Sequence, residues 1–341
     1  MSNLTNQPIF FERNRVGRVY TGGKLFHDFF GDEPVDGFKP EEWIASNVTA
    51  LNKDSVDPKE GVSKIKDSDV YFDDLLKENP TELLGSSGKL RVLVKGLDSS
   101  IRLPAQAHPD KAFSRKHFNS EYGKTECWTI LGTRPGAKIY FGFKEGVTQE
   151  IFEEAIEKSE TDLDAMENLM LSLTPQIGDV YMVPARTVHA IGAGCLILEV
   201  QEPTDFTIQP ERWCGDYKLS DQEMYLGLSK ADAVSCFDFT EAPDSKMVPV
   251  VVETAENMTK ESVVSEKNTD CFIINRLKLT GGSYTPNVDD SYAIYIVTEG
   301  NGSVQGDGYE KEIKKGDYFF MPASCMGSFS ITGNAEIIEC Y

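Results

Sequence analysis

The 341-residue sequence predicts a mainly β fold that contains two small barrels, with helical insertions in its N-terminal part. Three observations predict this arrangement. Glycine and proline interrupt the chain at short intervals, and β-branched or aromatic runs lie between them, as at 90–94, 138–141 and 194–200. A weak repeat connects residues 178–200 with residues 316–340. The length exceeds that of a usual single hydrophobic core, so two packed modules are expected.

The repeat indicates an internal duplication. Residues 178–189 read GDVYMVPARTVH and residues 316–327 read GDYFFMPASCMG, so Gly, Asp, Pro and Ala recur in register. A tight Gly-Asp turn followed by an aromatic strand that stops at proline suits a compact β-barrel, because proline cannot pair within a central strand. Gly327 takes the position of His189 in the second copy. We therefore expect any chemistry of His189 to be absent there.

Helical patterns are fewer and lie in the first two thirds of the chain. Residues 62–84 predict short helical pieces, and residues 148–173 predict a long helix from apolar residues at three- and four-residue spacing. A shorter helix is expected to start near Pro109 and cover 111–118. The polar stretch 241–268 is the expected linker, with a boundary near Leu226 as the alternative. We place one domain in 1–240 and a second in 241–341.

The composition narrows the class of protein. A net charge of -21 argues against nucleic acid or an anionic membrane as the main partner, because both would repel the chain. No apolar run is long enough to cross a membrane and no secretory segment opens the chain, so a cytoplasmic protein is expected. The seven cysteines are scattered without a C-x-x-C pair, which predicts free thiols in a reducing compartment.

Few residues are available for a metal site, since the chain has four histidines. Gln106 and His108 are two apart in LPAQAHP, so in an extended segment both face one side. Glu126 enters an apolar run and needs a cation or hydrogen bonds there, while His189 follows a strand that ends at Pro184. Two imidazoles, a carboxylate and an amide oxygen suit zinc at about 2.0–2.2 Å. By spacing alone, a second explanation is as good as a metal site: the histidines form ordinary hydrogen bonds and Glu126 forms an ion pair with Lys124.

Four segments, LPAQAHPDK, GKTECW, VPARTVHAIGAG and LEVQEPTDF, resemble in order and spacing the active-site segments of class I mannose-6-phosphate isomerases of the short bacterial type. The resemblance covers roughly residues 17–212. It implies a metal-binding cupin (double-stranded β-helix) in the N-terminal part and a metal-free cupin after it. It also implies one divalent metal, most simply Zn²⁺, on four ligands: Gln106, His108, Glu126 and His189.

The same resemblance implies roles for other residues. Lys124 matches the family's active-site lysine, and Glu199 matches an acid that takes part in proton transfer between C1 and C2. Glu199 paired with Arg186 or Lys124 is the alternative explanation. We expect four residues to line the substrate pocket: Ser46, Arg186, Asp205 and Gln209. The implied reaction interconverts mannose 6-phosphate and fructose 6-phosphate, with the sugar phosphate as partner and a homodimer as a candidate assembly.

The chain departs from the family pattern at two positions. The family commonly has Ser where this chain has Pro104, which cannot contact a phosphate through a hydroxyl. The family also has an arginine where this chain has Gln209, which carries no charge. We expect Arg212 to replace that arginine in catalysis and Arg102 to serve the phosphate.

These departures leave two alternative functions open. A catalytically weakened cupin would bind a sugar or sugar phosphate as a sensor or regulator. A cupin oxygenase would use iron, but such sites usually take two histidines from one H-x-H strand, and Gln106 occupies the first of these places here.

Overall fold

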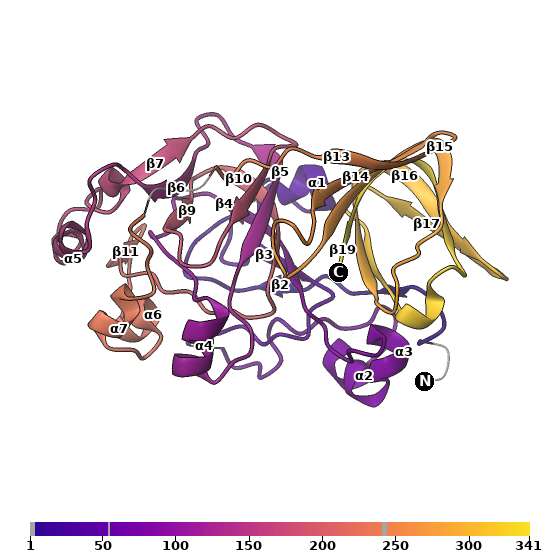
Figure 1. The fold of residues 1–341 in the computed structure, drawn as a ribbon, viewed down its shortest axis with the longest axis horizontal. Helices are drawn as coiled ribbons and strands as arrows, with labels where there is room; N and C mark the ends of the chain where they lie inside the picture. Colours follow the sequence, from indigo (N-terminus) through magenta and orange to yellow (C-terminus); the bar gives the residue numbers. More distant parts are fainter. Residues whose placement is uncertain (1–3, 54, 241–243) are drawn as a thin grey trace.

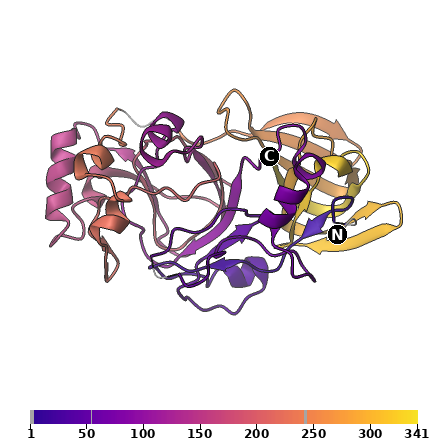
Figure 2. The ribbon, with the colours of Figure 1, turned by 90° about the horizontal axis from the view of Figure 1, so that it is seen from below.

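The computed structural model describes residues 4–53, 55–240 and 244–341. It is mainly β, as predicted, and its α-helices all precede residue 240 within the described residues. The helices are α1 Phe26–Phe30, α2 Phe72–Glu78, α3 Pro80–Leu84, α4 Lys111–Phe118, α5 Gln149–Lys158, α6 Asp221–Tyr225 and α7 Lys230–Val234. Helices α5, α6 and α7 lie at the end of the molecule opposite the C-terminal strands (Figures 1 and 2). No helix in the described ranges has the length and apolarity of a bilayer-crossing segment.

The first large sheet has six antiparallel strands in the order β2-β3-β4-β10-β5-β8. Their bounds are β2 Arg15–Val16, β3 Glu41–Ile44, β4 Leu93–Ser99, β10 Cys195–Gln201, β5 Glu126–Thr133 and β8 Val180–Val183. A three-stranded sheet β7-β6-β9 accompanies it, with β7 Met170–Leu173, β6 Ile139–Phe143 and β9 His189–Ile191. A short hairpin pairs β11 Trp213–Cys214 with β12 Tyr217–Lys218.

The second large sheet follows the order β1-β18-β16-β19-β15-β14-β13, and β17 pairs with β16. The bounds are β1 Ile9–Phe10, β13 Val250–Ala255, β14 Met258–Val264, β15 Ile274–Tyr284, β16 Ala293–Gly306, β17 Tyr309–Lys314, β18 Tyr318–Met321 and β19 Ser330–Cys340. The first strand of the chain, β1, therefore pairs with β18 at the edge of the C-terminal sheet.

The two sheets repeat one strand order, which extends the repeat seen in the sequence. The order β3-β4-β10-β5-β8 in the first sheet corresponds to β14-β15-β19-β16-β18 in the second. Glu199 in β10 is in register with Lys95 and Trp128, and Glu339 in β19 is in register with Asn275 and Tyr295. Each central strand therefore has a buried glutamate at the same place.

One hydrophobic cluster lies between the two large sheets, and each sheet also encloses a cluster of its own. Because side chains alternate along a strand, one face of each central strand packs between the sheets and the other faces its own interior. Leu198 and Ile338 belong to the shared core, whereas Ile197 and Ile337 belong to separate clusters inside the first and second sheets. This alternation places Glu199 on the inner face of the first sheet.

Two element predictions are wrong. The helix predicted for 148–173 ends at Lys158, and Met170–Leu173 form strand β7 against β6. The Ser159 hydroxyl donates to the carbonyl of Ile156, which competes with continuation of the helix. Within the expected linker 241–268, residues 250–264 form the β13–β14 hairpin, because pairing with β15 satisfies their backbone groups. The predicted domain boundary at 240/241 borders residues 241–243, which lie outside the described residues.

Candidate metal centre and substrate cavity

Four side chains from three distant segments meet at one end of the first sheet. Gln106 and His189 form an antiparallel bridge, with both backbone N–H···O distances at 2.9 Å. His108 lies two residues further on the same side, as predicted, while Ala107 points into a separate apolar cluster. Glu126 begins strand β5. All four residues are buried, and the described part of the chain offers His108, Glu126 and His189 as a group able to hold a metal ion.

The separations between these side chains suit a small cation. His108 Nε2 lies 3.1 Å from His189 Nε2 and 3.2 Å from Glu126 Oε2. His189 Nε2 lies 3.4 Å from Glu126 Oε1 and 3.4 Å from the amide nitrogen, Nε2, of Gln106. Ligands about 2.1 Å from a tetrahedral ion would lie roughly 3.4 Å from one another. The observed spacing is therefore close to that of a divalent metal site.

Hydrogen bonds fix the tautomer of both imidazoles. His108 Nδ1 lies 2.9 Å from the carbonyl oxygen of Phe206, and His189 Nδ1 lies 2.9 Å from that of Thr187. A carbonyl accepts only, so each Nδ1 carries the proton and each Nε2 directs a lone pair inward. Burial lowers the pKa of His108 to about 3, with Lys124 adding to the effect, and burial also lowers that of His189. Two neutral imidazoles facing a carboxylate form a donor set that suits a divalent cation.

Lys124 and Trp128 complete the surroundings of Glu126. Lys124 Nζ lies 3.0 Å from Glu126 Oε2 and 2.8 Å from His108 Nε2, and Trp128 Nε1 donates to Glu126 Oε1 at 2.9 Å. Burial would raise the pKa of Glu126, but the Lys124 ammonium holds it well below its usual value. The Glu126–Lys124 ion pair expected as an alternative is therefore present together with the converging ligand set.

Glu199 lies next to this centre, linked to it by Trp128. The Trp128 indole donates to Glu199 Oε2 at 3.2 Å as well as to Glu126. Lys95 Nζ lies 3.5 Å from Glu199 Oε1. The partner of Glu199 is thus Lys95, and the predicted pairing with Arg186 or Lys124 does not occur among the ion pairs of the described residues. Burial, and then the negative charge of Glu126, raise the pKa of Glu199.

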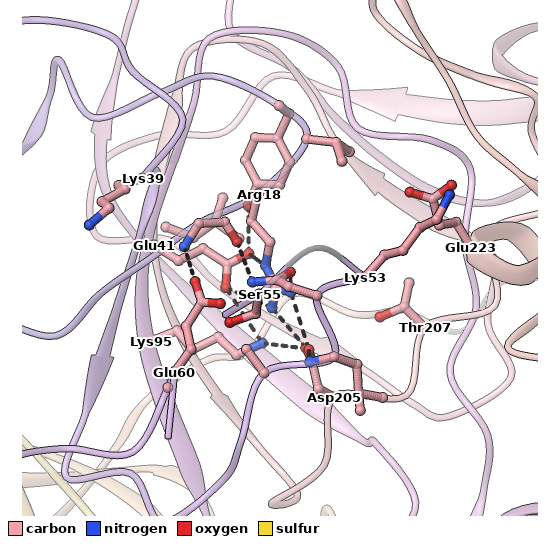
Figure 3. Close-up of a pocket in the computed structure, with 18 of the residues that line it drawn as sticks. Arg18, Lys39, Glu41, Lys53, Ser55, Glu60, Lys95, Asp205, Thr207 and Glu223 are labelled. Atoms are coloured by element: carbon pink, nitrogen blue, oxygen red, sulfur yellow. Dashed lines mark hydrogen bonds and ion pairs between the residues drawn. The ribbon is translucent and has the colours of Figure 1, made fainter. Parts of the chain in front are cut away.

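A cavity of about 1130 Å³ opens beside Glu199. Gln106 and Lys124 reach it from the metal centre, and Asp205, Gln209 and Pro104 line it as well. Its described lining includes nine lysine or arginine and six aspartate or glutamate side chains, although the whole chain has a net charge of -21. Such an excess of positive side chains favours an anionic small molecule. Figure 3 shows Arg18 and Lys95 in contact with Asp205 at the wall of this cavity.

The structure adds three residues to the site that the sequence analysis missed. Arg18, Glu41 and Lys95 line the cavity and form an ion-pair network with Asp205 (Figure 3). Lys95 extends this network to Glu199. Lys95 had a signal in the sequence, since it interrupts the apolar run VLVKGL in the way that Glu126 enters its own apolar run. Arg18 had none, because it is 187 positions from its partner Asp205.

Four predicted residues lie elsewhere. Arg212 forms ion pairs with Glu160 and Asp221, and Arg102 with Glu211 and Glu167, so neither supplies a guanidinium to the described cavity lining. Arg186 lies outside that lining too and donates to the carbonyls of Cys236 and Ser235.

Ser46 is fully buried and bonds to residues 48 and 63 rather than facing the described cavity. Gln209 does line the cavity, but its amide donates to the carbonyl of Glu223. These corrections share one physical reason: local ion pairs or hydrogen bonds satisfy each side chain away from the cavity or at its wall.

Known proteins resemble this chain over most of its length. The model of the family described as "Mannose-6-phosphate isomerase, cupin domain" matches residues 264–341. The mannose-6-phosphate isomerase ManA of Bacillus subtilis is 30% identical over 250 residues, which cover 72% of this chain and 73% of the relative. The probable mannose-6-phosphate isomerase GmuF of the same organism is 29% identical over 97% of this chain and 98% of its own. The crystal structure of a Bacillus subtilis mannose 6-phosphate isomerase shares the fold, with a TM-score of 0.78 at 24% identity over 98% of this chain and 100% of the other.

Proposed function

This chain belongs to the class I mannose-6-phosphate isomerase family of the cupin superfamily, and we propose that it is a metal-dependent isomerase that interconverts mannose 6-phosphate and fructose 6-phosphate. One observation carries the proposal. The buried set Gln106, His108, Glu126 and His189 converges beside Glu199 at a cavity rich in cationic side chains. The excess of cationic lining residues supports a phosphorylated sugar over a free one.

We propose that Gln106, His108, Glu126 and His189 hold the metal, and that it is Zn²⁺. Two imidazole nitrogens and two oxygens suit zinc, although manganese, iron and nickel accept the same donors. When bound, the ion supplies Lewis acidity toward the substrate oxygens. The amide of Gln106 is the weakest donor of the set, so its replacement should lower metal affinity less than replacement of either histidine.

The protein's own residues move the proton. We assign Glu199 as the base that takes a proton from one of C1 and C2 and returns it to the other. The Trp128 N–H fixes the orientation of its carboxylate, and burial favours the protonated form that the second half-step requires. Lys124 and Lys95 place ammonium groups beside the region where negative charge develops. Asp205 and Gln209 are assigned to substrate contacts from the cavity wall.

The two halves are proposed to be two cupin barrels, a metal-binding one in 1–240 and a metal-free one in 241–341. The repeated strand order and the register of Glu199 and Glu339 support this division. In the second half, Gly327 takes the place of His189. Glu339 forms an ion pair with Lys260 and accepts hydrogen bonds from the hydroxyl groups of Tyr284 and Tyr295. We propose that this half supports the fold rather than the chemistry.

The test is an isomerase assay on metal-depleted and metal-reloaded protein. We expect conversion of mannose 6-phosphate that chelation abolishes and one equivalent of Zn²⁺ restores. His108→Ala should lose both the metal and the activity, whereas the control His117→Ala, on the surface helix α4, should keep both. Sugar-phosphate-dependent thermal stabilisation without turnover by the zinc-loaded protein would instead support the sensor function.

A cytoplasmic location and a homodimer complete the proposal. The seven free, buried cysteines are consistent with a reducing compartment. Fractionation of cells and light scattering of the purified protein test the two statements.

A further inference from the structure

Arg18 connects two carboxylates that line the cavity, those of Glu41 and Asp205. Its Nε and Nη2 donate to Glu41 at 2.8 and 3.1 Å, and its Nη2 and Nη1 donate to Asp205 at 2.9 and 3.2 Å. The backbone N–H of Arg18 is bonded to the carbonyl of Phe38, so the side chain starts from a fixed point. Its side chain is 14% exposed, which leaves part of the guanidinium at the cavity surface.

Lys95 competes for the same carboxylates. Its ammonium lies 3.5 Å from Glu199, 3.7 Å from Asp205 and 4.0 Å from Glu41. Three carboxylates therefore share two cations within one buried group, and both cations also lie over the ring of Trp43, at 4.8 and 5.4 Å. In a buried environment, Coulomb attraction is weakly screened, so an ammonium moves toward the carboxylates whose charge is least neutralised by other cations.

We propose that Arg18 is a positioning residue of the isomerase: by neutralising Glu41 and Asp205 it leaves the Lys95 ammonium in contact with the proton-transferring Glu199. The expected effect on kcat rests on the proposed function, whereas the expected effect on the position of Lys95 does not. Without Arg18, Glu41 and Asp205 have Lys95 as their remaining close cation, so Lys95 is drawn away from Glu199.

Neither the two other arginines of the cavity lining nor Gln209 takes over this task. Arg15 is engaged by Asp32 and Glu42, and Arg13 lies over the rings of Phe30 and Tyr318. Gln209, on the same segment as Asp205, offers a neutral amide that is already bonded to a backbone carbonyl. Among the described ion pairs, those of Asp205 are with Arg18 and Lys95.

The kinetic test compares Arg18→Met with a matched control, Arg134→Met. Arg134 also bridges two carboxylates, Asp36 and the buried Asp98, with a side chain 20% exposed, but it lies outside the described cavity lining. We expect Arg18→Met to lower kcat by about 10- to 100-fold with a smaller change in KM, because misplacement of one group in a site costs about that much. Arg134→Met should lower thermal stability and keep kcat per folded molecule.

Two rescues separate positioning from folding. Arg18→Lys should recover part of kcat, since it keeps the charge but loses the bidentate geometry. Guanidinium ion added at millimolar concentration should raise kcat of Arg18→Ala and leave that of Arg134→Met unchanged. Loss of kcat that is equal in the Arg18→Met and Arg134→Met variants, or no response to either rescue, would overturn the proposal.

A crystal structure of Arg18→Met supplies the readout that does not need turnover. We expect the Lys95–Glu199 distance to grow beyond the ion-pair limit of about 4 Å while Lys95 approaches Glu41 and Asp205. An unchanged Lys95–Glu199 contact in that variant refutes the role of Arg18. Absence of isomerase activity in the metal-loaded wild type would instead refute the proposed function alone.

Discussion

Replacing Glu199 by glutamine should separate catalysis from folding. The amide has nearly the same volume and still presents an oxygen to the Trp128 N–H, which donates to Glu199 at 3.2 Å. Lys95 keeps Glu41 and Asp205 as partners, so no buried cation is left unpaired. The variant loses the ability to accept and return a proton, together with the ion pair to Lys95 at 3.5 Å. Because a positioned base contributes about 10²–10⁴-fold, we expect kcat to fall by that factor with the metal content unchanged.

The stability of Glu199→Gln follows from the sign of the pKa shift. The pKa of Glu199 is raised in the folded protein by burial and by Glu126. A carboxyl group with a raised folded pKa contributes stability below its unfolded pKa and loses that contribution as pH rises through the folded pKa. Ionisation of Glu199 therefore costs more free energy in the folded protein than in the unfolded chain. The glutamine variant should be at least as stable as the wild type at pH 7, measured by urea unfolding.

Glu339→Gln in the second sheet is the matched control. Glu339 occupies the register position of Glu199 but accepts hydrogen bonds from Tyr284, Tyr295 and Asn275 and forms an ion pair with Lys260 at 2.6 Å. A glutamine amide would face the Asn275 and Lys260 donors with its own N–H groups. The loss of two hydrogen bonds to a charged acceptor should cost roughly 3 kcal/mol or more of unfolding free energy.

The two variants should thus show opposite phenotypes. Glu339→Gln should keep kcat per folded molecule within about two-fold of the wild type, while Glu199→Gln keeps stability and loses kcat. A Glu199→Gln protein that retains turnover within about ten-fold would refute the assignment of the base. Equal losses of kcat in both variants would refute the argument that only the first sheet carries the chemistry.

Three further predictions follow from the same geometry. His189→Ala should reduce bound metal, measured by elemental analysis of purified protein, by well over half, while the seven buried cysteines stay free by thiol titration. Glu41→Gln should destabilise the protein most at neutral pH. Burial would raise the pKa of Glu41, but Arg18 and Lys95 lower it to about 2. The ionised carboxylate therefore contributes on the order of 3 kcal/mol to the free energy of unfolding above about pH 4.5, and this contribution disappears as the pH falls toward 2. Gln209→Arg should raise kcat/KM for mannose 6-phosphate, because position 209 lines the cavity and the new guanidinium would face it; unchanged kcat/KM would show that the network around Arg18 already meets that need.

The sequence by itself predicted the β class, the strand-level repeat and the four residues that converge in the candidate metal centre. These features depend on local pattern: strand alternation, the Gly-Asp turn and proline in each copy, and an LPAQAHP segment that places Gln106 and His108 on one side. Helix 111–118 was predictable for a similar reason, since the side chain of Asp110 caps it by accepting from the N–H of Phe113.

Tertiary structure alone decided the partners of the charged residues. Arg212 and Arg102 lie near the site in sequence but are held by Glu160 and Glu211, whereas Arg18 reaches Asp205 across 187 positions. Strand β7 and the β13–β14 hairpin likewise depend on pairing with other strands, β6 and β15. A buried ion pair forms where the fold brings opposite charges together and excludes water, so its partners follow from three-dimensional packing rather than from sequence spacing.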